Sequence, residues 1–393
     1  MRSANIQVLR ALAALGVVGH HLFFYLQRVS AGRLHETPEV LAVGVDVFFV
    51  LSGYLMAETS LRRGEPRSFM QARIERVVPM YWLCTLATAV IAGMGFRIFG
   101  LEEVSPTHFL ESMFFLPPSG ANPAPLLYVG WTLNYEMFFY GMFALCLFLP
   151  GAPSRLKAVL SLIALLQLGG LLGLALGNRY LSYWGSPLLL EFAMGVLLSQ
   201  YAQKHVLLPR AAWLVIAVAL LPIASTEWLD VIMEWHVTRV LLWGLPSAAI
   251  VYAALSLERS GRRLELPWLL RLGDASFAIY LIHPFVLQVC GTASMRIGLH
   301  GSNLNCALSA LAAAVFSVLA GLVVHQYMEK PLHDWTRGQK ALQALPFARR
   351  PEGSLGRARD RAGERASEAR LHASHPVRQL PHAQSAQAAR TQR

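Results

Sequence analysis

Residues 9–26 read LRALAALGVVGHHLFFYL, an apolar run that contains three ionisable side chains. About 20 mostly apolar residues are enough to cross the hydrocarbon of a bilayer as one helix, so this run predicts a membrane span. Arg10, His20 and His21 are costly at membrane depth, where ionisable residues usually have a function. The stretch therefore predicts a membrane fold and a polar site inside it.

The composition of the whole chain supports this interpretation. Of its 393 residues, 55% are hydrophobic and 15% are charged, whereas soluble domains have about 45–50% and about 25%. No A-x-A cleavage site follows the first span, so we expect it to remain as an anchor. We expect an all-α polytopic protein with about ten spans, at residues 6–26, 40–59, 76–96, 126–149, 157–176, 184–201, 210–225, 238–257, 274–297 and 303–327.

The charges of the loops predict the topology. With ten spans, one set of alternate loops carries 13 Lys and Arg residues and the opposite set carries four. Because loops rich in Lys and Arg stay in the cytoplasm, both termini are expected there. We expect a multi-pass protein of the bacterial inner membrane.

The net charge of +11 comes mainly from the C-terminal tail. Residues 337–393 contain 12 Lys and Arg against 4 Asp and Glu, with few aromatic residues. We expect a membrane domain at residues 1–335 and a disordered cytoplasmic tail at residues 336–393. Loops and tail account for the basic balance, so no nucleic-acid partner is expected. The four cysteines form no CxxC pair, and no metal site is expected.

The two histidines of the first span differ in helical phase. Arg10 and His21 are 11 residues apart, which is about three helical turns or ~16 Å along one face. His20 is rotated by about 80–100° from that face. The pair on one face suits a polar cleft. The alternative is that Arg10 reaches the headgroups and both histidines lie near the opposite interface.

Asp46 begins the second span, in VGVDVFFVLSGYLM (residues 43–56). It is expected at the depth of His21, where a carboxylate would fix the tautomer of the imidazole and raise its basicity. A structural hydrogen bond or a helix cap is the alternative for Asp46. In the same segment, Ser52, Gly53 and Tyr54 are expected to allow close helix packing.

The third and fourth spans contribute more ionisable residues. Arg73 and Arg76 share one helix face, where two guanidinium groups suit phosphates, although from their spacing alone ordinary cytoplasmic charge is the favoured explanation. Glu136 is expected to be buried in VGWTLNYEMFFYG (residues 129–141), with Trp131 and Tyr140 as candidate supporting residues of the site. A buried carboxylate needs a proton or a basic partner, so Glu136 marks an interior site.

His283, followed by Pro284, is expected near mid-depth in the ninth span, as helix packing or as support for the site. The chain contains no Walker loop, GxGxxG, HExxH or GxSxG motif, so any chemistry is expected inside the membrane.

Five segments in order resemble the bacterial acyltransferase-3 family of integral membrane O-acyltransferases, and most closely its exopolysaccharide O-acetyltransferases. They are LRALAALGVVGHH, GVDVFFVLSGYLM, RIERVVPMYW, WTLNYEMFFY and ASFAIYLIHPF. The resemblance covers about residues 5–335. It implies that His21 is the catalytic histidine preceded by Arg10, that Arg73 and Arg76 handle the acyl donor, and that Glu136 is the buried acid of the family. Tyr54 stands where many relatives have Phe.

The resemblance implies transfer of an acyl group, with acetyl-CoA as the expected donor, to a hydroxyl of a surface polysaccharide or of its lipid-linked precursor. The donor would enter from the cytoplasm, and no bound cofactor is expected. His21 would act as a general base or would itself be acylated. Asp46 or Glu136 would orient His21 or balance its charge.

Two other functions fit the same residues. A transporter or flippase for a lipid-linked sugar or a small anion also uses intramembrane Arg, His and Glu. Such proteins often carry internal repeats, which this sequence lacks. A structural subunit of an export complex would leave the buried charges without a purpose.

Overall fold

The structure is a computed structural model that describes residues 3–30, 39–62, 64–96, 98, 104–119, 124–229, 237–299 and 302–334. It separates into two units, Met1–Thr336 and Arg337–Arg393. The second unit, and with it the tail expected at residues 336–393, lies outside the described residues. The orientation of the termini across the membrane remains a prediction.

Regular structure in the described part of the chain is helical throughout, which confirms the all-α prediction. The α-helices are α1 (Ala4–Val29), α2 (Gly44–Ser60), α3 (Pro66–Gly93), α4 (Pro106–Met113), α5 (Trp131–Cys146), α6 (Ala152–Leu176), α7 (Arg179–Trp184), α8 (Leu189–Lys204), α9 (Pro209–Leu229), α10 (Val237–Arg239), α11 (Leu245–Arg259), α12 (Pro267–Asp274), α13 (Ser276–Arg296) and α14 (Asn303–Val324). Two 3₁₀-helices, η1 (Glu39–Val43) and η2 (Tyr128–Gly130), and two π-helices, η3 (Val240–Gly244) and η4 (His325–Glu329), extend or join them.

Within these ranges, nine helical segments are long and apolar enough to cross a membrane. They correspond to nine of the ten expected spans. The tenth, expected at residues 126–149, corresponds to α5, which has 16 residues and is therefore about 24 Å long. This helix is too short to count by length alone, although η2 precedes it directly.

Specific contacts fix the start of α1. The Ser3 side chain accepts a hydrogen bond from the backbone N–H of Ile6, as an N-cap does. Glu258, at the end of α11, accepts hydrogen bonds from the backbone N–H groups of Ala4 and Asn5 at 3.1 and 3.0 Å. A carboxylate satisfies N–H groups that have no partner within the helix. The first turn of α1 is thereby fastened to α11.

Helix α2 packs against α8 through two glycines. A Cβ on Gly53 would lie 2.1 Å from the carbonyl oxygen of Phe192, and a Cβ on Gly195 would lie 2.0 Å from that of Val50. Only glycine fits at such distances, so the two backbones touch. The expected close packing at Ser52, Gly53 and Tyr54 is confirmed for Gly53.

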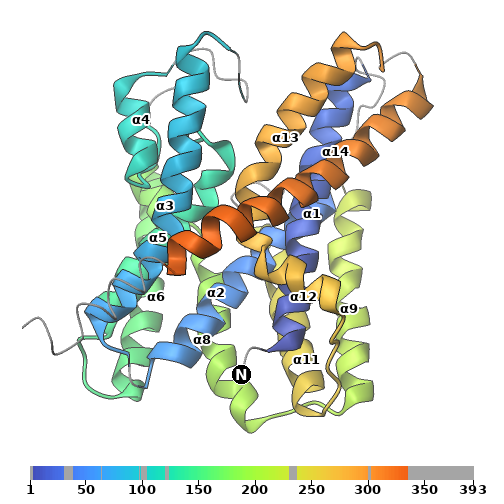
Figure 1. Cartoon of the computed structure of the whole chain (residues 1–393). Helices are drawn as coiled ribbons and strands as arrows, with labels where there is room; N and C mark the ends of the chain where they lie inside the picture. The colour runs from blue at the N-terminus through green and yellow to red at the C-terminus, as the bar shows by residue number, and fades with distance from the viewer. Residues whose placement is uncertain are drawn as a thin grey trace, which may run out of the picture. The chain divides into compact units, whose positions relative to one another are not determined.

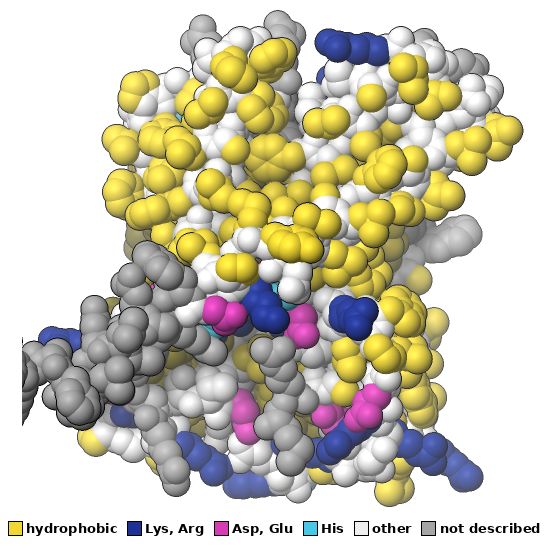
Figure 2. Space-filling model, in the orientation of Figure 1, with side chains coloured by type: hydrophobic (Ala, Val, Ile, Leu, Met, Phe, Trp, Pro, Cys, Tyr) yellow, Lys and Arg dark blue, Asp and Glu magenta, His cyan; other side chains and the backbone are white. Residues whose placement is uncertain are grey.

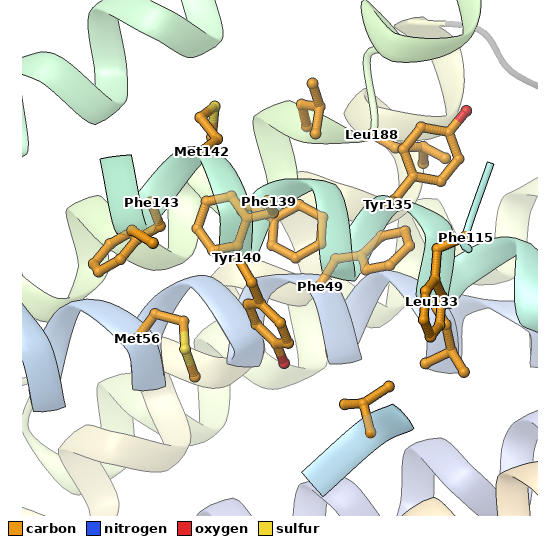
Figure 3. Packing of buried hydrophobic residues seen from close by; sticks show 14 of the residues in the cluster. Phe49, Met56, Phe115, Leu133, Tyr135, Phe139, Tyr140, Met142, Phe143 and Leu188 are labelled. Carbon is orange, nitrogen blue, oxygen red and sulfur yellow. The ribbon is translucent and has the colours of Figure 1, made fainter. Parts of the chain in front are cut away.

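The arrangement places α1 at the centre of one group of helices (Figure 1). It contacts α2, α11, α12, α13 and α14. Helices α3, α4, α5 and α6 form the other group, and α2 and α8 connect the two. Aromatic side chains of α2 and α5, including Phe49, Tyr135 and Phe139, pack together between these two helices (Figure 3). Figure 2 shows the molecule in the orientation of Figure 1. Hydrophobic side chains cover the upper part of the visible face, as expected for contact with lipid.

Candidate active site

Two histidines from different helices meet in the membrane region. His21 lies in α1 and the fully buried His283 lies in α13. The Nδ1 atom of His21 is 2.9 Å from the Nε2 atom of His283, and their ring centroids are 5.0 Å apart. The sequence suggested His283 only as support or packing, and the structure makes it the direct partner of His21.

The hydrogen bonds around this pair define its neutral tautomers. Nδ1 of His283 lies 3.1 Å from the carbonyl oxygen of Ile279, which can only accept, so this nitrogen carries the proton. Nε2 of a neutral His283 is then an acceptor, and Nδ1 of His21 donates to it. The lone pair of His21 is therefore on Nε2, where it can take a proton or attack a carbonyl carbon.

Aromatic side chains hold the His21 ring in place. Tyr128 packs edge-on against it with ring centroids 5.0 Å apart. His20 is also an edge-on neighbour, at 5.2 Å, and packs on Phe24. His21 therefore faces α13, whereas the ring of His20 lies against Phe24.

Arg10, which was predicted to share one face of α1 with His21, lines a partly open cavity of about 90 Å³. Its Nη2 donates to Ser276 Oγ at 2.8 Å, and its Nη1 donates to Gln7 Oε1 at 3.2 Å. The cavity lies between α1, α2, α3, α5 and α13. Its polar lining consists of Arg10, Ser52, Arg76, Thr132, Glu136, Tyr140, Ser276 and Tyr280.

Glu136 faces this cavity beside two hydroxyl groups. Ser52 Oγ donates to its Oε1 at 3.2 Å, and the Tyr140 hydroxyl donates a short hydrogen bond to the same oxygen. Arg10 and Arg76 line the same cavity. The structure thus brings the predicted acid together with two of the three predicted donor-binding arginines.

Arg73 lies behind the cavity rather than on its wall. Its guanidinium packs over the rings of Phe69 and Tyr140, at 5.4 and 5.8 Å from their centroids. Its buried Nε has no hydrogen-bond partner among the described residues. Tyr140 separates Arg73 from the cavity, so the two arginines predicted to act together occupy different positions.

Tyr280 connects the cavity to the histidine pair. It lines the cavity, and its ring centroid is 6.1 Å from that of His283, one turn along α13. Its hydroxyl donates to the carbonyl oxygen of Val129 at 2.7 Å and lies 2.7 Å from Thr132 Oγ1. Tyr280 thus lies next to both the arginine-lined cavity and His283.

The expected pairing of Asp46 with His21 is wrong in this structure. Nε and Nη2 of Arg239 donate to the two carboxylate oxygens of Asp46 at 3.0 and 2.9 Å. A guanidinium fork satisfies both oxygens at once, which a single imidazole nitrogen cannot do. Trp131 and Trp243 pack against the guanidinium, with centroids at 5.9 and 5.0 Å. Trp131 therefore packs against the arginine of this ion pair.

Sequence reasoning missed Arg239. The available signal was a basic residue just inside the start of an apolar span, at a depth similar to that of Asp46. Glu191 of α8, also fully buried, interacts electrostatically with both residues. Gly244 packs on the Glu191 carboxylate: a Cβ there would lie 2.9 Å from Glu191 Oε1. Helices α2, α8 and α10 thus meet at one buried charged cluster.

Comparisons with known proteins give relatives for nearly the whole chain. Residues 3–326 match the profile of a family described as an acyltransferase domain. The exopolysaccharide production protein ExoZ of Rhizobium meliloti is 35% identical, over 77% of this chain and 93% of its own length. The acyltransferase MdmB of Streptomyces mycarofaciens is 25% identical, over 84% of this chain and 92% of its own. No solved structure gives a significant match.

Proposed function

Because the chain belongs to the acyltransferase-3 family, we propose that it transfers an acyl group from acyl-CoA to a hydroxyl of an exported polysaccharide or of its lipid-linked precursor. Acetyl-CoA is the donor to test first. The similarity to a protein named for exopolysaccharide production supports this class of acceptor. The proposed location is the bacterial inner membrane.

The observation that carries the proposal is the His21–His283 pair. The chain of hydrogen bonds from the Ile279 carbonyl through His283 leaves Nε2 of His21 as a lone-pair nitrogen. Such a nitrogen can accept the proton of an alcohol, and general base catalysis of this kind contributes about 10²–10⁴-fold. His283 is then a positioning residue that fixes the tautomer and the ring orientation of His21.

The first proposed route transfers the acyl group directly from the thioester to the acceptor hydroxyl. Nε2 of His21 removes the hydroxyl proton as the acceptor oxygen bonds to the thioester carbonyl carbon. The carbon–sulfur bond breaks, and the departing thiolate takes the proton from His21. Alternatively, Nε2 attacks the thioester first and the thiolate leaves, which forms an acyl-imidazolium; this then passes its acyl group to the hydroxyl, and the proton released by the hydroxyl neutralises the thiolate. Both routes need the same lone pair.

The cavity arginines are proposed to bind the donor. Arg10 and Arg76 line the same cavity as Glu136, and guanidinium groups bind phosphate through charge-assisted hydrogen bonds. Glu136, held by Ser52 and Tyr140, balances their charge. Small-molecule sites have volumes of about 300–1,000 Å³. The cavity of about 90 Å³ must therefore widen when a donor enters.

NMR of surface polysaccharide from wild-type and deletion strains tests this function. We expect O-acyl groups to be lost in the deletion strain and restored by the wild-type chain, but not by His21→Ala. Unmodified polysaccharide trapped inside the deletion strain would instead indicate a flippase. Fully acylated polysaccharide at the surface of that strain would contradict the proposal.

A further inference from the structure

A second concave site lies on the outside of α6. It is a groove of about 850 Å³ between α6, α7 and the segment Pro117–Pro118, and Leu190 of α8 and Val237 of α10 also line it. Along α6 it extends from Ala164 to Leu174, which is about 15 Å at 1.5 Å per residue. This length is about half the hydrocarbon thickness of a bilayer, so the groove matches one leaflet.

The helix crossing that forms the groove depends on glycine. A Cβ on Gly170 would lie 2.3 Å from the carbonyl oxygen of Gly185, and a Cβ on Gly173 would lie 2.6 Å from the backbone nitrogen of Ser182. The backbone of α7 therefore rests directly on α6. On the α6 side, Leu168, Leu171 and Leu174 are more than half exposed.

The polar side chains of the wall bond within the protein. Gln167 donates to the carbonyl oxygen of Ser186 at 3.0 Å, and Ser182 donates to that of Asn178 at 3.1 Å. The Tyr183 hydroxyl accepts a hydrogen bond from Asn134 at 3.1 Å. The groove consequently offers hydrocarbon a mainly apolar surface.

Arg179 is the only charged residue in the described lining of the groove, and it lies beyond the end of α6. It donates to the carbonyl oxygen of Ser119 at 2.7 Å and packs over the ring of Tyr180 at 5.5 Å. The Ser119 contact uses one of the five N–H donors of a guanidinium. The exposed side chain can therefore also bind an anion at the end of the groove.

One wall of the groove is shared with the interior of the protein. Tyr183 stacks on Tyr135 with ring centroids 4.8 Å apart and an interplanar angle of 16°. Tyr135 in turn contacts Phe49, which lines the central cavity, at 6.4 Å. If the chain crosses the membrane ten times, α1 and α6 run in the same direction. Arg179 and the His21 end of α1 would then lie on one side of the membrane.

We propose that this groove binds the lipid part of a lipid-linked acceptor, with an isoprenoid chain along α6 and its phosphate at Arg179. The inference rests on the proposed function and narrows its acceptor to the lipid-linked form. Bilayer and groove are both apolar, so moving the chain between them gives little free energy. The groove must therefore select a lipid-linked phosphate over other lipids through the contact of the phosphate with Arg179 and through its own shape.

Photocrosslinking of the full-length protein in phosphatidylcholine nanodiscs tests the groove. The probe is a long-chain polyprenyl phosphate with a diazirine on the chain, and the matched polyprenol lacks the phosphate. We expect the phosphate probe to label residues 164–190 and the polyprenol to label them weakly. Because a charge-assisted hydrogen bond is lost, Arg179→Gln should reduce labelling at least about tenfold.

A variant that fills the groove is the second arm of the test. Leu171→Trp should also prevent labelling, and it should fold because Leu171 is 62% exposed. Leu311→Trp, equally exposed on α14, and Arg28→Gln are the matched controls and should label as wild type does. Labelling outside the groove, equal competition by phosphatidylglycerol, or normal labelling of Arg179→Gln would overturn the proposal.

Labelling can be judged separately from acyl transfer. His21→Ala should bind the probe normally while transferring nothing, since His21 is not part of the groove. A wild-type protein that is labelled in the groove but transfers no acyl group would contradict the proposed function alone. Transfer of acyl groups at the same rate by the wild-type protein and by the Arg179→Gln and Leu171→Trp variants is a different result. It would contradict the groove proposal alone.

Discussion

Replacing His283 tests whether a second histidine orients the first. His283→Phe keeps an aromatic ring in the fully buried position but removes the acceptor that lies 2.9 Å from His21 Nδ1. The imidazole of His21 then loses this acceptor and retains its backbone hydrogen bond with Val17, or the ring adopts the tautomer that places the proton on Nε2. A hydrogen bond of this kind contributes about 0.5–1.5 kcal/mol, which predicts a turnover rate about 2- to 13-fold lower.

His283→Gln is the matched variant. Its amide can donate to the Ile279 carbonyl and accept from His21, as the imidazole does, so most of the turnover should return. The assay is transfer of labelled acetyl from acetyl-CoA by protein in nanodiscs, with size-exclusion chromatography to compare folding. KM for acetyl-CoA should not change in either variant, because His283 does not line the cavity. Normal turnover of His283→Phe, or equal loss in both variants, would show that His283 does not orient His21.

Four further predictions concern the cavity, the buried ion pair, the packing of α2 and the topology. Arg76→Gln should raise KM for acetyl-CoA about tenfold or more, whereas the exposed Arg67→Gln should not, as steady-state kinetics will show. Asp46→Asn removes the bidentate carboxylate partner of Arg239 and should cost about 3–5 kcal/mol, seen as a lower unfolding temperature that Arg239→Gln partly restores. Gly53→Ala should reduce the yield of folded protein on detergent size-exclusion chromatography, whereas Gly141→Ala, where an added Cβ would have open space around it, should not. A C-terminal alkaline phosphatase fusion should be inactive, and an active fusion would place the C-terminus outside.

Hydropathy predicted the helical spans because length and apolar composition alone decide whether a helix crosses a bilayer. Among the described helices, α5 is the one expected span that is too short to count by length alone. Part of its apolar run lies in the η2 turn and not in the helix. Helical phase also separated His21 from His20 correctly, because the angle between neighbouring residues is fixed within one helix.

Contacts between helices were not predictable in the same way. Helical phase gives the face of a residue but not which helix packs on it. Asp46 and His21 were expected at one depth, yet Asp46 faces α10 and binds Arg239. For the same reason His283 was recognised only as support, and Trp131 was assigned to the site rather than to the ion pair.

The proposed mechanism depends above all on the direct participation of His21 Nε2 in acyl transfer. The decisive experiment compares labelled acetyl transfer to acceptor by purified wild-type protein, His21→Ala and His20→Ala in nanodiscs. We expect a rate about 10²–10⁴-fold lower for His21→Ala, with His20→Ala keeping most of the wild-type rate. Normal transfer by folded His21→Ala, or an equal loss in His20→Ala, would contradict this role of His21.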